Sequence, residues 1–171
     1  HFGYGLNIWH TETMNIKNCS LKYNGKYGIY SIDSGLLNAS HNYLYQNSHG
    51  GIRMYGDFFN SIFNNTVKEN DGPGFSGSSL SYISMINNKF VANLYDGSRF
   101  MSCGHLTISR NKFSDNTYSG IYFSLSSSIY FYNNTLIGNN EYGLFNLSST
   151  FILFENNTYM NNTHGSIYVS L

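Results

Sequence analysis

Polar and apolar residues recur along this chain with a period of 23 residues, without insertion or deletion. The strictest column is glycine, at Gly5, Gly28, Gly51, Gly74, Gly97, Gly120 and Gly143, with Ser166 next in line. A second column holds Asn24, Asn47, Asn70, Asn93, Asn116, Asn139 and Asn162, and a third holds Asn42, Asn65, Asn88, Asn111, Asn134 and Asn157. Self-similarity at a fixed period is typical of a repeat architecture.

Apolar columns accompany the polar ones and predict the secondary structure. Within each repeat, apolar residues lie two positions apart, as at Met14 and Ile16, and Ile152 and Phe154 continue the same two columns. A spacing of two is that of the inward positions of a β-strand, and no stretch keeps the period of a helix. We therefore predict an all-β chain: a right-handed, single-stranded parallel β-helix of about seven coils, with 23 residues and three short strands per coil.

The asparagine columns are predicted to be structural. Asparagine tolerates the left-handed conformation that the sharp turns of a stacked coil require. Identical side-chain amides one coil apart can also hydrogen-bond as a ladder along the axis, which satisfies polar groups that are costly to bury. We expect this ladder at Asn42, Asn65, Asn88, Asn111, Asn134 and Asn157.

Composition excludes several function classes. Only 11% of the residues are charged and the formal net charge is zero, so the chain lacks the basic surface that nucleic-acid binding needs. No apolar run reaches the roughly 18 to 20 residues of a membrane span. The 25 Asn, 17 Gly and single proline indicate many turns, whereas 16 Tyr and 13 Phe are unlike the composition of a disordered chain.

Length and chain ends predict the domain organisation. A chain of 171 residues is long enough for one domain with a substantial core. It starts at His1 rather than Met, shows no signal peptide, and has no polar cap at either end. We therefore expect residues 1–171 to be a single parallel β-helix domain within a longer chain, whose further coils, or neighbouring subunits, cover both ends.

Three segments carry a family resemblance: residues 62–67 (IFNNTV), 131–136 (FYNNTL) and 120–123 (GIYF). They resemble the right-handed parallel β-helix repeat superfamily, which includes pectate lyases, polygalacturonases, phage tailspikes and many archaeal and bacterial surface proteins. It also includes the periplasmic proteins that help load copper into nitrous oxide reductase. The Asn-Asn-Thr-rich style is most similar to the surface and copper-maturation branch. The resemblance implies a secreted, extracytoplasmic protein that often contacts carbohydrate.

The cysteines and glycosylation sequons can be placed on the predicted coil. Cys19 and Cys103 lie about 17 Å apart along the axis, too far for a disulfide, and Cys19, in a ladder position, is expected to be buried. Four sequons share the outward column immediately before the ladder: Asn18, Asn64, Asn133 and Asn156. We expect these four to carry glycans if the source cell glycosylates, and Asn146, in an inward column, to be bare.

One face of the predicted coil carries a dip between two arginines. At the third coil both outward rows shrink to serine, with Gly77 between them, while Arg53 and Arg99 stand on either side about two coils apart. Two guanidinium groups over a floor of small residues with aromatic flanks could hold an acidic sugar. The predicted ligand-binding residues are Arg53, Tyr55, Ser76, Arg99 and Tyr122. The competing interpretation is a passive face, or one that a flanking segment covers.

Catalytic and metal-binding patterns are scarce. We find no Asp-Asp pair of the polygalacturonase kind, no carboxylate cluster for Ca²⁺, and no metal spacing among the six His. We therefore expect no cofactor or metal. The leading hypothesis is a non-enzymatic, extracellular or cell-surface β-helical scaffold or fibre component that displays one face for adhesion or carbohydrate binding.

Two alternatives stay open. The first is a polysaccharide lyase, hydrolase or epimerase with a groove at the third coil, in which Arg53 and Arg99 bind carboxylates. His49, Asp71 or Asp96 on the neighbouring turns would then take part in proton transfer. The second alternative is a periplasmic metal-maturation helper.

Overall fold

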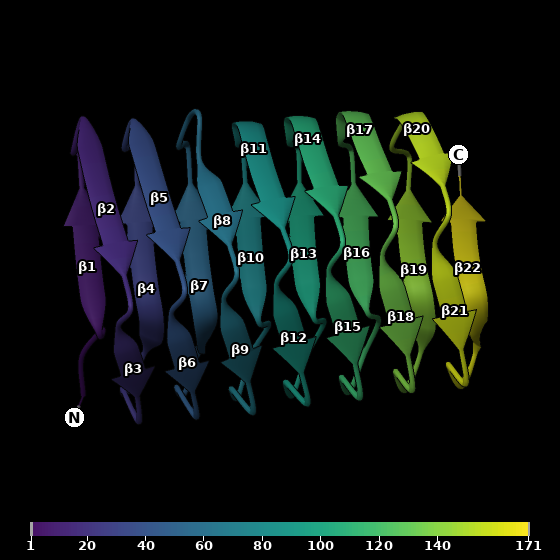
Figure 1. The fold of residues 1–171 in the computed structure, drawn as a ribbon, viewed down its shortest axis with the longest axis horizontal. Coiled ribbons are helices and arrows are strands. Elements are labelled where there is room, and N and C mark those ends of the chain that lie inside the picture. Colours follow the sequence, from purple (N-terminus) through teal and green to yellow (C-terminus); the bar gives the residue numbers. More distant parts are fainter. Residues whose placement is uncertain (1, 171) are drawn as a thin grey trace.

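The computed structural model describes residues 2–170, and they form a β-solenoid of three parallel sheets, which we name A, B and C (Figure 1). Sheet A contains β1 (Leu6–Trp9), β4 (Tyr27–Ile32), β7 (Gly50–Tyr55), β10 (Phe75–Ser78), β13 (Ser98–Met101), β16 (Ile121–Ser124), β19 (Tyr142–Leu147) and β22 (Gly165–Ser170). Sheet B contains β2 (Thr13–Lys17), β5 (Leu36–Ser40), β8 (Ser61–Phe63), β11 (Ser81–Ile86), β14 (Gly104–Ser109), β17 (Ser127–Tyr132) and β20 (Phe151–Glu155). Sheet C contains β3 (Ser20–Lys22), β6 (Tyr43–Tyr45), β9 (Thr66–Lys68), β12 (Lys89–Val91), β15 (Lys112–Ser114), β18 (Thr135–Ile137) and β21 (Thr158–Met160).

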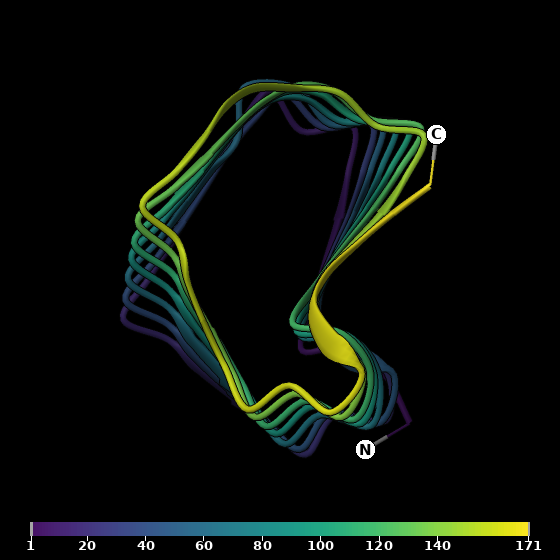
Figure 2. The same cartoon turned by 90° about the vertical axis from the view of Figure 1, so that its right-hand side faces the viewer.

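The register of the sheets follows the sequence period. Arg53 lies opposite Ser76, and Ser76 lies opposite Arg99, so residues 23 apart are neighbours along the axis. In Figure 1, sheet A runs upward behind sheets B and C, which run downward, and successive coils advance from left to right. This path is right-handed, and Figure 2 shows the coils superposed along the axis. The predicted right-handed β-helix of about seven coils, with three strands per coil, is confirmed.

Close packing explains the glycine column. A Cβ atom built on Gly51 would lie 2.2 Å from Cγ1 of Val67 and 2.5 Å from the carbonyl oxygen of Gly74. A Cβ atom built on Gly97 would likewise lie 2.5 Å from the carbonyl oxygen of Gly120. These glycines are not among the residues with positive φ. The column therefore requires glycine because no side chain fits there.

The asparagine ladder is confirmed. The amide nitrogen of Asn65 donates to Oδ1 of Asn88 at 3.0 Å, and that of Asn88 donates to Oδ1 of Asn111 at 3.0 Å. The second asparagine column forms an equivalent ladder, with 2.9 Å between Nδ2 of Asn47 and Oδ1 of Asn70. The expectation of a left-handed backbone at the ladder residues is wrong, because positive φ falls on the outward residue just before each of them.

The core confirms the inward columns except in the last coil. Ile62, Met85 and Ile108 are fully buried. Ile152, expected inward, is 60% exposed. The register between β17 and β20 shifts after Ile129, which pairs with Phe151, so that Phe151 packs against the core in place of Ile152.

Both cysteines are free thiols. Cys103 is buried, whereas Cys19 is only partly buried, contrary to expectation. Cys19 is the first residue in its column, and its backbone N–H donates to Oδ1 of Asn42 at 2.9 Å. The ladder thus begins at the backbone N–H of Cys19, and its side chain is only partly buried. Within residues 2–170, no helix is long and apolar enough to cross a membrane.

Candidate functional site

A cavity of about 360 Å³ lies over sheet A. Figure 2 shows the outline of the coil bending inward where the chain enters this sheet. The cavity, which we call the arginine groove, is lined by Arg53, Pro73, Ser76, Tyr95, Arg99 and Met101. Three of the residues predicted to bind ligand therefore lie together in one hollow.

The floor of the groove is β10, the fourth strand of sheet A, rather than part of the third coil. Arg53 on β7 and Arg99 on β13 flank Ser76 in register, which separates the two arginines by about 10 Å at the usual strand spacing. Ser76 is only 3% exposed, and its Oγ accepts a hydrogen bond from Nη1 of Arg53. This bond holds the guanidinium group of Arg53 against the groove floor.

Arg99 contacts two aromatic rings. Its guanidinium carbon lies 4.3 Å from the ring centroid of Tyr122 and 5.1 Å from that of Tyr95. Its Nη1 lies 3.6 Å from Oδ2 of Asp96. Its Nε is buried without a hydrogen-bond partner among the residues that the structure describes. Cation–π contacts with two rings restrain the guanidinium group, and the unpartnered Nε leaves hydrogen-bonding capacity unused.

Asp96 is a buried carboxyl group beside this arginine. It is 3% exposed, and its Oδ1 accepts a hydrogen bond from the backbone N–H of Ser119 at 3.1 Å. Burial raises the pKa of Asp96 to about 7, although the charge of Arg99 and the Ser119 hydrogen bond favour the ionised form. Desolvation of this buried carboxyl group is the largest of these effects, and it outweighs the attraction of the nearby arginine. The carboxyl group beside Arg99 therefore has a pKa close to neutral pH.

Aromatic side chains extend from the groove along the axis. On the N-terminal side the rings of Tyr27 and Tyr30 are stacked at 5.9 Å. On the C-terminal side Tyr122 stacks on Phe145 at 5.3 Å, and Phe145 stacks on Tyr168 at 4.5 Å. Burial raises the pKa of Tyr27, and nearby Arg53 partly offsets this. The groove therefore opens between two aromatic surfaces, which correspond to the aromatic flanks expected from the sequence.

The other predicted site residues take different places. Tyr55 is 46% exposed on β7 and does not line the groove. Tyr122 does not line the groove either, but its ring contacts the guanidinium group of Arg99, which does. The ring of His49 lies 6.0 Å from that of Tyr27, outside the groove lining. Asp71 lines a separate cavity, so Asp96 is the one proposed proton-transfer residue that contacts a residue lining the groove.

Three groove residues were not among the predicted ligand-binding residues: Met101 at the end of β13, and two turn residues. Tyr95 and Pro73 lie in the turns that precede sheet A, outside the alternation of the strands. The available signal for Tyr95 was its position just before Asp96 and four residues before Arg99. A turn residue four positions from a strand residue can still reach it when the chain bends between them.

The sequon column lies on the corner between sheets B and C. Asn18, Asn133 and Asn156 are exposed. Asn64 is half-buried, and its amide contacts Nε2 of His41 at 3.1 Å. Asn146 is 2% exposed, as its inward column predicts. Glycosylation at Asn18, Asn64, Asn133 and Asn156 stays a prediction.

A family model described as periplasmic copper-binding protein (NosD) matches residues 2–149. The fold is similar to the periplasmic alginate epimerase AlgG (T265N T268M double mutant), with a TM-score of 0.81 and 20% identity over 85% of this chain and 36% of that one. It is also similar to the A-module of the Azotobacter vinelandii mannuronan C-5 epimerase AlgE4, with a TM-score of 0.58 and 15% identity over 96% of this chain and 56% of that one.

A third similar structure is the enzymatically active domain of bacteriophage CBA120 tailspike protein 2. Its TM-score is 0.70, and it is 16% identical over 85% of this chain and 23% of that chain. The chain spans only 36% of the length of the AlgG structure. No curated protein sequence matches the chain.

The copper named in that family description does not fit the donor groups of this chain. Among residues 2–170, no three His, Cys, Asp or Glu side chains lie close enough together to hold a metal ion. The buried thiol of Cys103 donates to the carbonyl oxygen of Met101 at 3.3 Å, and Met54 and Met85 are fully buried in the core. We therefore assign no role to copper.

Proposed function

The chain belongs to the NosD family of periplasmic proteins, and from this premise we propose that it is an extracytoplasmic β-helical scaffold that binds an acidic saccharide in the arginine groove. The observation that carries the proposal is the pair of arginines in register with Ser76 between them. A polyuronate presents one carboxylate per sugar, and guanidinium groups bind carboxylates through charge-assisted, bidentate hydrogen bonds.

Preorganisation supports a binding role. Arg53 is hydrogen-bonded to Ser76, and the guanidinium group of Arg99 contacts the rings of Tyr95 and Tyr122. A side chain that is already ordered loses less conformational entropy when a ligand binds. The aromatic side chains on either side offer apolar surface for the sugar rings themselves. Adhesion to an acidic polysaccharide follows directly from such a surface.

The test is a glycan array followed by calorimetric titration with oligomannuronate and oligogalacturonate. We expect acidic oligosaccharides to bind, and Arg53→Ala to weaken binding about 10- to 100-fold, because a hydrogen bond to a charged group contributes about 1.5–3 kcal/mol. Arg110→Ala is the matched control, since Arg110 is exposed on another corner of the coil. Equal affinities of the wild type and Arg53→Ala for acidic oligosaccharides would mean that these ligands do not bind in the arginine groove.

A second candidate function is polysaccharide modification by an epimerase or lyase. It is favoured by Asp96, whose pKa of about 7 suits a group that takes up or releases a proton near neutral pH. Two of the similar structures are epimerases, which act on alginate and mannuronan. Incubation with polymannuronate, followed by NMR of the sugar C5 protons and assay of unsaturated chain ends, tests this function. Turnover that Asp96→Asn abolishes would establish catalysis and overturn the purely structural role.

A further inference from the structure

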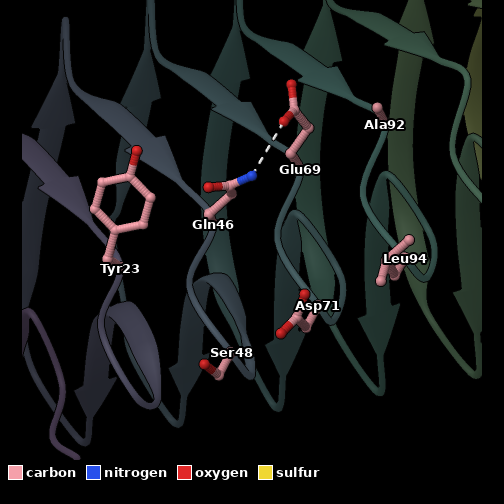
Figure 3. A pocket seen from close by; sticks show the side chains of 7 residues that line it. All are labelled: Tyr23, Gln46, Ser48, Glu69, Asp71, Ala92 and Leu94. Atoms are coloured by element: carbon pink, nitrogen blue, oxygen red, sulfur yellow. Dashed lines mark hydrogen bonds between the residues drawn. The ribbon is translucent and has the colours of Figure 1, made fainter. Parts of the chain in front are cut away.

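A second cavity, of about 520 Å³, lies at the corner where sheet C leads into the turns before sheet A. Figure 3 shows its walls as two rows of side chains from successive coils. The first row consists of Tyr23, Gln46, Glu69 and Ala92, and the second consists of Ser48, Asp71 and Leu94. We call this hollow the corner cavity.

The asparagine ladder creates the corner cavity. Between the two rows lie Asn47, Asn70 and Asn93, which are fully buried. The residue before each of them has a left-handed backbone, with φ of 48° at Gln46 and 53° at Glu69. Each coil therefore turns its ladder residue inward and presents its two neighbours outward. The result is a trough parallel to the axis, whose length over four coils is about 14 Å.

The two ends of the trough are apolar. The ring of Tyr23 is 62% exposed at one end, and the side chain of Leu94 is 55% exposed at the other. The rings of Tyr23 and Tyr45 meet edge to face, with centroids 5.6 Å apart. This contact orients the Tyr23 ring and leaves much of its surface free. An aromatic ring of this kind can pack against the C–H face of a sugar.

The middle of the trough is polar and rich in acceptors. Nε2 of Gln46 donates to Oε2 of Glu69 at 3.4 Å (Figure 3), and Nζ of Lys68 lies 3.0 Å from Oε1 of Glu69. Hydrogen bonds from Lys68 and Tyr45 lower the pKa of Glu69, so its carboxylate is ionised. Asp71 is exposed and makes no side-chain hydrogen bond or ion pair with the residues that the structure describes.

These groups select for hydroxyl donors and against anions. A carboxylate accepts strong hydrogen bonds from sugar hydroxyls, and the amide of Gln46 and the hydroxyl of Ser48 can both donate and accept. A uronate would bring its own negative charge beside Asp71, and the lining contains no cation to bind it. The nearby ammonium of Lys68 is already paired with Glu69. We propose that the corner cavity binds a neutral saccharide, with Tyr23 against the sugar ring and Asp71 accepting from its hydroxyls.

The corner cavity and the arginine groove are separate sites. Asp71 lines the first and Pro73 lines the second, so one turn divides them. The two linings share no residue. The proposal of a neutral-saccharide site can therefore be tested independently of the proposal of an acidic-saccharide site.

The experiment is a calorimetric titration of the whole chain with maltohexaose, cellohexaose and mannohexaose. We expect at least one of these neutral oligosaccharides to bind, and Asp71→Asn and Tyr23→Ala each to weaken that binding at least fivefold. Both side chains are exposed, so both variants should fold. Binding of oligomannuronate should be unchanged by either substitution.

Asp115→Asn is the matched control, because Asp115 is exposed in the same row as Glu69 and lies outside the cavity lining. It should bind neutral oligosaccharides as wild type does. Absence of binding by all three oligosaccharides would overturn the proposal. Binding that Asp71→Asn and Tyr23→Ala leave unchanged would overturn it as well, because the saccharide would then sit elsewhere.

Discussion

The guanidinium carbon of Arg99 lies 4.3 Å above the ring centroid of Tyr122, the residue directly opposite it on the next strand of sheet A. The contact is a consequence of register, because residues 23 apart face the same way on adjacent coils. It converts a long, mobile side chain into one with a fixed plane. The aromatic row thus positions the cation that we propose to bind the ligand.

Tyr122→Leu should weaken binding of oligomannuronate about three- to tenfold. A cation–π contact of this kind contributes on the order of 1 kcal/mol, which orients Arg99 before the ligand arrives. Calorimetric titration measures the change. Tyr130→Leu is the control, since Tyr130 is an exposed tyrosine on sheet B, outside the groove lining. Equal effects of the two substitutions would mean that Tyr122 does not position Arg99.

Binding of acidic saccharides should weaken as the pH rises through about 7. Below its pKa, Asp96 is neutral, so the charge of Arg99 is free to pair with a ligand carboxylate. Above that pKa, the ionised carboxylate of Asp96 competes for Arg99 and repels the ligand. Glu141 adds to the negative potential at Asp96, while the backbone N–H of Ser119 partly offsets it.

Asp96→Asn tests this origin of the pH dependence. The amide cannot ionise, so the affinity of the variant should stay constant when titrations are repeated on either side of about pH 7. Asp115→Asn, a substitution at an exposed corner, should keep the wild-type pH profile. A profile that persists in Asp96→Asn would assign the titration to another group.

The period of the sequence was sufficient to predict the fold, because it fixes which residues are neighbours along the axis. Physical causes were harder to predict than positions. The high glycine content indicates turns, yet Gly51 in the glycine column is required by close contacts with Val67 and Gly74. Left-handed backbone was assigned to the ladder, yet it falls on residues such as Asn64. Ile152 was misplaced because a register shift in one strand pair leaves no mark on the period.

Within the candidate site, strand residues were predictable and turn residues were not. Arg53, Ser76 and Arg99 lie in one column of sheet A, where alternation decides which side chains point outward. Asp71 and Asp96 both lie in turns before this sheet, but they occupy different columns. The chain bends between these columns, so Asp71 faces the corner cavity while Asp96 contacts Arg99.

Gly97→Ala should destabilise the protein by about 1–3 kcal/mol, the usual cost of overpacking. A Cβ atom there would lie 2.5 Å from the carbonyl oxygen of Gly120 and 2.8 Å from Nδ2 of Asn116. Gly104→Ala is the control, because its nearest contact would be Oγ of Ser127 at 3.8 Å. Urea unfolding followed by circular dichroism measures both. The steric explanation of the column fails if the two substitutions cost the same.

Asn88→Ala should lower the free energy of unfolding by about 3 kcal/mol. The Asn88 amide donates to Oδ1 of Asn111 at 3.0 Å and to the carbonyl oxygen of Ile62 at 2.8 Å, and its Oδ1 accepts from the backbone N–H of Asn65 at 2.8 Å. Removing it leaves several buried polar groups without partners, and each such group costs about 1–3 kcal/mol, although relaxation around the site recovers part of the sum.

Asn140→Ala separates the effect of the ladder from that of losing any asparagine. Asn140 is exposed, and its Oδ1 accepts only a 3.5 Å hydrogen bond from Thr163, so its loss should change stability by less than about 0.5 kcal/mol. Hydrogen exchange gives a second readout, because the Asn65 N–H loses its acceptor in Asn88→Ala but not in Asn140→Ala. Faster exchange of that single amide, beyond what global destabilisation explains, would locate the damage at the broken rung. Uniform acceleration across all three sheets would mean instead that the ladder acts only through overall stability.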